Sequence, residues 1–221
     1  MSDAKITLAI FDMDGLMLDT ESVSLLAWNE VNRRFGIEIP KDVLESLYGC
    51  NREVCRQRMT KALGETFRFD EAIEIHNAFS AAYTDAHGVA LKPGLLEMLG
   101  FLDENKIRKC VATSTGKARA RHLLSQIGIA ERFDHIIGGD EIKNGKPDPE
   151  IFLKSAAAFH KNPSECIVLE DSIAGIEAAY KGGFHSICIP DLAQPDSITR
   201  ERASAVCANL LEAIAYMKKF I

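Results

Sequence analysis

The sequence lacks three features that mark common classes of protein: excess positive charge, long apolar runs and closely paired cysteines. Its 32 acidic residues outnumber its 26 lysines and arginines, and the net charge is −6. This balance argues against nucleic acid or an anionic membrane as a partner. No apolar stretch approaches the length of a membrane-spanning helix, about 20 residues, and the apolar run near the N-terminus is too short for a signal peptide. We therefore expect no membrane partner.

The cysteines point to a reducing compartment. None of the six lies in a CxxC pair, and Cys110, Cys166 and Cys188 fall inside predicted strands, where a free cysteine behaves as a small apolar side chain. We therefore expect a soluble, cytoplasmic protein with reduced thiols.

Several catalytic signatures are also missing. There is no nucleophile-elbow serine motif and no dinucleotide-binding glycine fingerprint. The histidines are scattered without metal-ligand spacing, and we expect each to be an ordinary surface or core residue. These absences turn attention to the acidic residues.

The order of apolar segments predicts the fold class. Residues 18–88 contain only helical patterns, whereas strands and helices alternate from residue 92 onward and a short strand precedes residue 12. Such alternation is typical of a parallel sheet covered on both faces. We expect an α/β protein with a Rossmann-like core formed by residues 1–17 and 89–221, and an inserted all-helical cap at residues 18–88.

The chain is organised around the end of its first predicted strand. An apolar run over residues 6–11 is followed by Asp12 and Asp14, which begin on the same side of an extended backbone, and Gly15 allows a sharp turn. Two carboxylates this close repel unless a cation or a shared proton lies between them. Carboxylate oxygens suit Mg²⁺. A calcium loop is excluded, because the glycine is at the wrong position and Val23 stands where the bidentate glutamate belongs.

Polar side chains follow three further strands. Thr113 and Ser114 open a helix whose free amides attract anions, although helix capping is an equally good explanation. Lys146 lies in a loop restricted by glycine and prolines. This is not a Walker loop, because Pro147 replaces the serine or threonine. In an open parallel sheet, ligands bind beyond the carboxyl ends of the strands.

The fourth strand ends at a pair of acids. Glu170 and Asp171 directly precede a helix, and capping explains one of them but not both. The four predicted strands are thus followed, in chain order, by acids, hydroxyls, a lysine and a second pair of acids. This set fits metal-assisted phosphoryl transfer, in which a carboxylate attacks phosphorus and the other groups neutralise and orient the phosphate.

Over essentially its whole length, the chain resembles the haloacid dehalogenase superfamily. The segments 12–15, 113–114, 145–149 and 170–172 with Gly175 match its four ordered motifs, and residues 14–21 with the helical insert look like its β-phosphoglucomutase-like branch. The resemblance implies a mobile cap and the hydrolysis of a small phosphate monoester, such as a sugar, polyol or nucleoside phosphate. It also implies a phosphoaspartate intermediate and Mg²⁺. A site closed by its own cap is compatible with a monomer.

The resemblance also assigns roles. Asp12 would be the nucleophile and a metal ligand. Asp14 would be the general acid and base, with its backbone carbonyl on the metal. Asp171 would bind the metal and Glu170 would do so directly or indirectly. The phosphoryl group would be held by Thr113, Ser114 and Lys146, with Thr113 and Ser114 open to exchange of roles. Arg52, in the cap, would contact a distal part of the substrate or else be a solvated helix start.

Other activities of the superfamily fit less well. Asp14 argues against dehalogenases and phosphonate-cleaving relatives, which lack it. Mutases carry a cap histidine at the position of Ser24, and no histidine precedes His76. We therefore expect a phosphatase. The alternatives are a β-phosphoglucomutase-type hexose-phosphate mutase and, less favoured, a non-catalytic protein that binds a phosphorylated metabolite.

Overall fold

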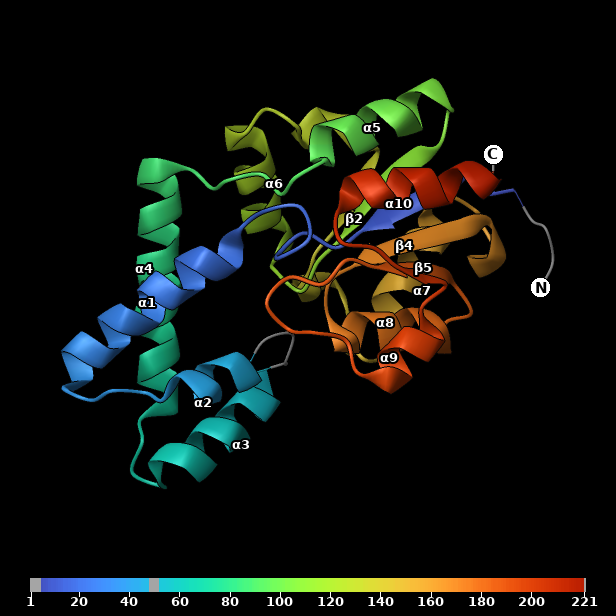
Figure 1. Cartoon of the computed structure of the whole chain (residues 1–221). Coiled ribbons are helices and arrows are strands. Elements are labelled where there is room, and N and C mark those ends of the chain that lie inside the picture. The colour runs from blue at the N-terminus through green and yellow to red at the C-terminus, as the bar shows by residue number, and fades with distance from the viewer. Residues whose placement is uncertain (1–4, 48–51, 221) are drawn as a thin grey trace.

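The protein consists of a parallel sheet with flanking helices and a separate group of four helices (Figure 1). The structure is a computed structural model and describes residues 5–47 and 52–220. Within these residues, the strands are β1 (Leu8–Phe11), β2 (Arg108–Ala112), β3 (His135–Ile137), β4 (Cys166–Glu170), β5 (His185–Cys188) and β6 (Ala205–Val206). The helices beside the sheet are α5 (Leu95–Glu104), α6 (Lys117–Gln126), α7 (Glu150–Ala158), α8 (Ile173–Lys181), α9 (Ser197–Arg202) and α10 (Leu210–Met217).

All six strands are parallel, in the order β3-β2-β1-β4-β5-β6. The chain runs outward from β1 in both directions, so the order reverses at β1 and its carboxyl end lies at the switch point where such sheets bind ligands. The predicted α/β, Rossmann-like fold is confirmed. Helix α9 was not predicted, because it has only six residues and they show no apolar stripe.

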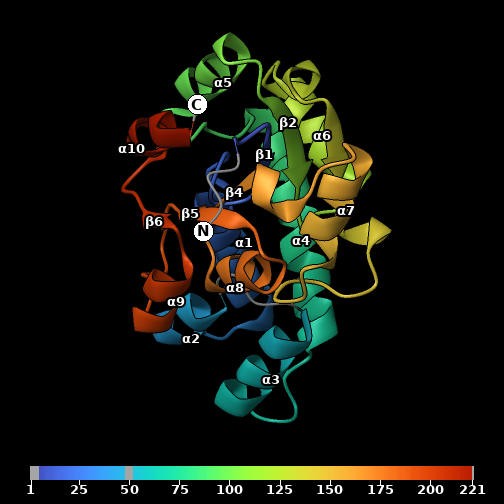
Figure 2. The ribbon, with the colours of Figure 1, turned by 90° about the vertical axis from the view of Figure 1, so that its right-hand side faces the viewer.

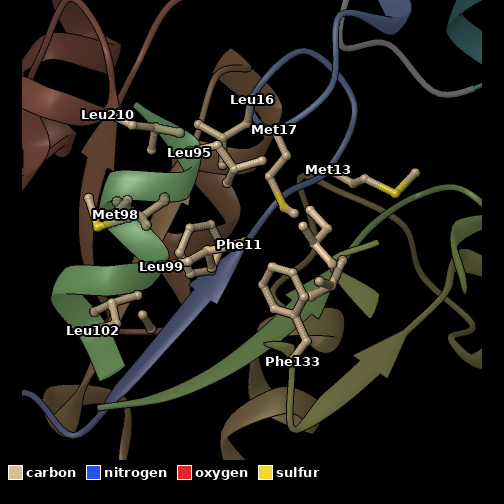
Figure 3. Close-up of a cluster of buried hydrophobic side chains, with 14 of the residues drawn as sticks. Phe11, Met13, Leu16, Met17, Leu95, Met98, Leu99, Leu102, Phe133 and Leu210 are labelled. Atoms are coloured by element: carbon tan, nitrogen blue, oxygen red, sulfur yellow. The ribbon is translucent and has the colours of Figure 1, made fainter. Parts of the chain in front are cut away.

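Alternate residues of each strand pack against opposite faces of the sheet. On one face, Phe11 of β1 packs with α5 and makes an edge-on contact with Phe133, at 5.6 Å between ring centroids (Figure 3). Helices α5 and α10 lie side by side over this face (Figures 1 and 2). On the other face, Ile10 packs with Phe152 of α7 and Ala179 of α8. Burial on both faces explains why β1 and β4 are apolar without alternation.

Helices α1 (Thr20–Phe35), α2 (Lys41–Ser46), α3 (Arg52–Leu63) and α4 (Phe69–His87) pack around a cluster of their own. Trp28 and Val31 of α1, Met59 of α3 and Phe69 of α4 are buried in it. Figure 2 shows α3 at the opposite end of the molecule from α5. Asp19 caps α1 by accepting a hydrogen bond from the amide of Ser22.

The two segments that join these helices to the sheet run side by side. The amide of Asp19 donates to the carbonyl of Ala90 at 2.9 Å, and that of Lys92 to the carbonyl of Met17 at 2.9 Å. A further contact joins α4 to α6, where the guanidinium of Arg119 binds Asp85 at 2.7 Å. The helical group is thereby held over the carboxyl edge of the sheet. Across the described ranges, no helix combines the length and apolar character needed to cross a membrane.

Candidate active site

The strand ends of β1, β2 and β4 and the loop before α7 open into one cavity of about 370 Å³, which we call the acidic cavity. Of the residues expected in the site, all but Thr113 line it: Asp12, Asp14, Arg52, Ser114, Lys146, Glu170 and Asp171. Residues from positions 12 to 171 thus meet because parallel strands end at the same edge of the sheet.

Lys146 is the only buried cation among the described residues that line this cavity. Its Nζ donates to Asp12 Oδ1 and, at 2.9 Å, to Glu170 Oε2, and all three side chains are buried. Burial opposes the charge of the lysine, but the carboxylates of Asp12 and Glu170 outweigh it and raise the pKa of Lys146. The ammonium is therefore permanently charged and positioned to accept an anion beside Asp12.

The Glu170 carboxylate packs against the N-terminus of α8. Ser172 donates to Glu170 Oε1 through its hydroxyl and through its amide at 3.2 Å, and the same hydroxyl accepts from the amide of Gly175 at 3.0 Å. A Cβ on Gly175 would lie 2.0 Å from Glu170 Cδ, so only glycine leaves room for the carboxylate. This packing explains why a glycine accompanies the acid pair in the sequence.

Three carboxylates converge beside Lys146. One oxygen from each of Asp12, Glu170 and Asp171 lies within 4.8 Å of the others, a donor set suited to a hard divalent cation. Burial and then the charge of Glu170 raise the pKa of Asp12 to about 8, and the same causes raise the pKa of Asp171 well above its usual range. One ammonium does not neutralise three carboxylates, so the residues present fit a divalent metal at this place.

Asp14 is held apart from that cluster by two hydroxyls. Its Oδ2 accepts from Thr113 at 3.1 Å and from Thr115 at 2.8 Å. The hydroxyl of Thr113 also accepts from the amide of Thr115 at 3.1 Å, and Thr113 is fully buried. Here Thr113 positions Asp14, whereas Ser114 lines the cavity. Thr115 was not predicted as a site residue, because its bond to Asp14 depends on how the loop after β2 folds.

Gly15 sets the distance between the first and fourth motifs. Its φ is +80°, and an added Cβ would lie 2.4 Å from Asp171 Oδ2. Gly15→Ala is expected to lower the free energy of unfolding by about 1–3 kcal/mol through the positive φ and to displace the Asp171 carboxylate. Chemical denaturation measures the first effect. The second is expected to weaken the binding of a divalent cation, which calorimetric titration measures. Gly64→Ala, also at positive φ but with open space around it, should change stability without changing cation binding.

Two further acids, Glu21 and Asp191, lie at the edge of the site, and neither was predicted from the sequence. Burial, followed by the charges of Asp14 and Asp191, raises the pKa of Glu21 to about 7, and Glu21 lines the acidic cavity. Asp191 follows β5 and binds Lys92 at 2.6 Å. Asp191 follows a predicted strand, so the rule applied to the other strand ends would have found it. Glu21 gave no such signal, because an acid in the first turn of a helix is ordinary.

Two residues of the helical group, Arg52 and His76, line cavities at the site. Arg52 lines the acidic cavity, but its guanidinium also binds Asp70 at 2.8 Å, so it is only partly available to a ligand. His76 was expected to be an unremarkable histidine. In the structure, His76 Nε2 lies 3.0 Å from Ser24 Oγ, and the two residues line a second cavity next to Asp14. Ser24 and His76 lie 52 positions apart in the sequence. Their contact could not be predicted, because it forms only where α1 packs against α4.

Comparison with known proteins gives the same picture. The family model described as haloacid dehalogenase-like hydrolase matches residues 9–189. A phosphorylated carbohydrates phosphatase of Thermotoga maritima is 31% identical over 80% of this chain and 82% of its own length. A probable pseudouridine-5'-phosphatase of Drosophila melanogaster is 32% identical over 85% and 83%. The crystal structure of a β-phosphoglucomutase from Clostridium difficile aligns with a TM-score of 0.80 and 27% identity, over 97% of this chain and 96% of that one. The chain therefore belongs to the haloacid dehalogenase-like hydrolases, in the branch that contains β-phosphoglucomutase-like proteins.

Proposed function

We propose that the protein hydrolyses a small phosphate monoester, such as a sugar, polyol or nucleoside phosphate, through a phosphoaspartate on Asp12. The observation that supports this most directly is the contact of Lys146 with both Asp12 and Glu170 beneath the cavity. A carboxylate next to a fixed ammonium can receive a phosphoryl group whose equatorial oxygens the same ammonium neutralises. The curated relatives named above are phosphatases.

The reaction has two displacements at phosphorus. Asp12 attacks, the ester P–O bond breaks, and the leaving alkoxide takes a proton from Asp14. Water then attacks the phosphoaspartate and gives a proton to Asp14, which restores both carboxyls and releases inorganic phosphate. Ser114 lines the cavity in the loop between β2 and α6, and its amide would orient the phosphoryl oxygens.

We further propose that the three-carboxylate cluster holds Mg²⁺. Asp12, Glu170 and Asp171 supply oxygens, and Asp14, two residues after Asp12, would add its backbone carbonyl. When bound, the ion neutralises negative charge on the phosphoryl group. We also propose a cytoplasmic location and action as a monomer.

Phosphate release from a panel of monoesters tests the proposal. Hexose, pentose, polyol and nucleoside monophosphates and an activated aryl phosphate are each incubated with Mg²⁺ or with EDTA. We expect release that requires Mg²⁺ and that returns when excess Mg²⁺ is added to the EDTA sample. Release at the same rate in EDTA would contradict the metal assignment. No release from any ester by folded protein would contradict the phosphatase function.

A mutase is the second candidate, because the aligned Clostridium difficile structure is a β-phosphoglucomutase and because His76 lies beside Ser24. Arg52 lines the acidic cavity and would contact the distal phosphate of a mutase substrate. Incubation with glucose 1-phosphate and a bisphosphate activator separates the two functions. A phosphatase releases inorganic phosphate faster than it forms glucose 6-phosphate, whereas the opposite order of rates would establish the mutase.

A further inference from the structure

The two oxygens of the Asp14 carboxyl have different surroundings. Oδ2 accepts from the hydroxyl of Thr113 at 3.1 Å and from that of Thr115 at 2.8 Å. No donor among the residues that the structure describes contacts Oδ1. Both donors belong to the loop between β2 and α6, so one short segment holds one oxygen of the carboxyl and leaves the other free.

The hydrogens available to the loop fix the direction of these bonds. The hydroxyl of Thr113 accepts from the amide of Thr115 at 3.1 Å, so its own single hydrogen is left for Asp14. An ionised carboxyl has no hydrogen to donate, so the hydroxyl of Thr115 must donate as well. Since a carboxylate oxygen accepts about two hydrogen bonds, the two threonines saturate Oδ2.

The proton that Asp14 gives and takes therefore belongs on Oδ1. A proton on Oδ2 would displace one of the two hydroxyls, and Thr113 is fully buried and would lose its acceptor. A proton on Oδ1 breaks no bond. A general acid must lie within hydrogen-bond reach of the oxygen that it protonates, and an anchored Oδ2 restricts rotation of the carboxyl and keeps Oδ1 in one orientation.

The loop that carries the threonines is itself held by the end of β3. The amide of Thr113 donates to the carbonyl of Ile137 at 3.1 Å, and the amide of Gly139 donates to the carbonyl of Thr115 at 3.0 Å. A Cβ on Gly139 would lie 2.2 Å from the carbonyl oxygen of Ser114, so only glycine permits this approach. The threonine hydroxyls are thus fixed to the sheet by backbone contacts.

Neighbouring residues of the loop face different spaces. Ser114 lines the acidic cavity, in which the phosphoryl group is proposed to lie. Thr115 lines the second cavity next to Asp14 and is not part of the acidic cavity. The hydroxyl of Thr115 can therefore be removed without removing a group that holds the phosphoryl oxygens.

We propose that Thr115 is a positioning residue for the general acid and base: together with Thr113 it anchors Asp14 Oδ2, so that Oδ1 alone exchanges protons. This assignment rests on the proposed phosphatase function. As Asp12 bonds to phosphorus and the ester P–O bond breaks, the leaving oxygen takes the proton from Oδ1. As water bonds to phosphorus and the bond to Asp12 breaks, the water proton passes to Oδ1.

Two aryl esters of similar shape separate this role from a structural one. Phenoxide needs a proton to leave, whereas dinitrophenoxide leaves without one. Thr115→Val removes the hydroxyl and keeps the shape of the side chain. It is expected to lower kcat/KM for phenyl phosphate about tenfold, because a hydrogen bond to a charged group is lost. The kcat/KM for dinitrophenyl phosphate should stay within about twofold of the wild type, since this parameter covers only the steps up to release of the aryl alcohol.

The second displacement has its own signature with dinitrophenyl phosphate. Hydrolysis of the phosphoaspartate limits turnover of so good a leaving group, and it needs Asp14 as the base. In Thr115→Val, kcat and KM for this ester should fall together, by about tenfold, and a burst of dinitrophenol should precede the steady state.

Three further variants serve as controls. Thr115→Ser keeps the hydroxyl and should resemble the wild type with both esters. Thr115→Ala should resemble Thr115→Val, so the result does not depend on how valine packs. Thr66→Val, at an exposed threonine in the turn after α3, is the matched control and should change neither kcat nor KM.

A double-mutant cycle shows whether Thr115 acts through Asp14. In the Asp14→Asn background, Thr115→Val is expected to cause no further loss of kcat/KM for phenyl phosphate, because the group that it positions is gone. A full additional loss there would overturn the assignment and leave the phosphatase function intact. Equal losses of kcat/KM for the two esters in the single variant, or no loss for either, would do the same. Failure of the wild type to hydrolyse any ester would overturn the phosphatase function and this inference with it.

Discussion

Asp12→Asn is expected to lower phosphatase turnover by about 10⁴-fold or more while the protein stays folded. The amide has the shape of the carboxyl but is too poor a nucleophile to attack phosphorus. Folding should survive, because burial and Glu170 already raise the pKa of Asp12 to about 8 and the substitution removes one of the crowded charges. Steady-state phosphate release and circular dichroism measure the two expectations.

The matched control for this variant is Asp42→Asn, an aspartate in the first turn of α2 that is exposed to solvent. It should leave turnover unchanged. If Asp12→Asn kept more than about a tenth of the wild-type turnover, the role of Asp12 as the nucleophile would be contradicted.

Lys146→Met is expected to affect both activity and stability. Removal of the ammonium leaves Asp12 and Glu170 buried without their cation, and breaking a buried ion pair from one side costs about 3–5 kcal/mol. Turnover should fall by about 10²–10³-fold, because the phosphoryl oxygens lose a positive charge. Denaturation by urea and steady-state kinetics measure these changes.

The stability loss of Lys146→Met should depend on pH in a definite direction. Lys146 lowers the pKa of Asp12, so its removal raises that pKa further above the ordinary value. A carboxyl whose pKa is higher in the folded than in the unfolded protein destabilises the fold as pH rises between the two values. Unfolding free energy should therefore keep decreasing above about pH 8 in the variant, where the contribution of Asp12 to the wild type levels off.

Lys109→Met is the matched control, since Lys109 is also a buried lysine that binds an aspartate, Asp103. Asp103 is half exposed and is also paired with Arg132, so the expected cost is about 1 kcal/mol or less, with unchanged activity. Equal losses of unfolding free energy in the two lysine variants would contradict the claim that Lys146 stabilises the buried carboxylates of Asp12 and Glu170.

The positions at strand ends could be predicted from the sequence, because a buried parallel strand leaves a local apolar signature and fixes where its last side chains lie. Asp12, Lys146, Glu170 and Asp171 come together for this reason. The glycines that accompany them, Gly15 and Gly175, are explained by the carboxylates that pack against them.

The contacts made by the helical group could not be predicted in the same way. The pairing of Ser24 with His76, and of Arg119 with Asp85, depends on the rotation of α4 against α1 and α6, which helical periodicity does not specify. Comparison by sequence position alone placed no histidine at Ser24, yet a histidine reaches that place from another helix. The hydrogen bond from Thr115 to Asp14 could not be predicted either, because it depends on the turn after β2.

Trapping of the phosphoaspartate tests the central claim most directly. The Asp14→Asn variant with Mg²⁺ is mixed with an activated aryl phosphate, whose leaving group needs no acid, so the first displacement proceeds while the second lacks its base. Quenching, borohydride reduction and peptide mass spectrometry then identify the modified residue. We predict conversion of Asp12 to homoserine that requires both substrate and Mg²⁺. Release of the aryl alcohol with Asp12 unmodified, or an adduct on another residue, would contradict the account.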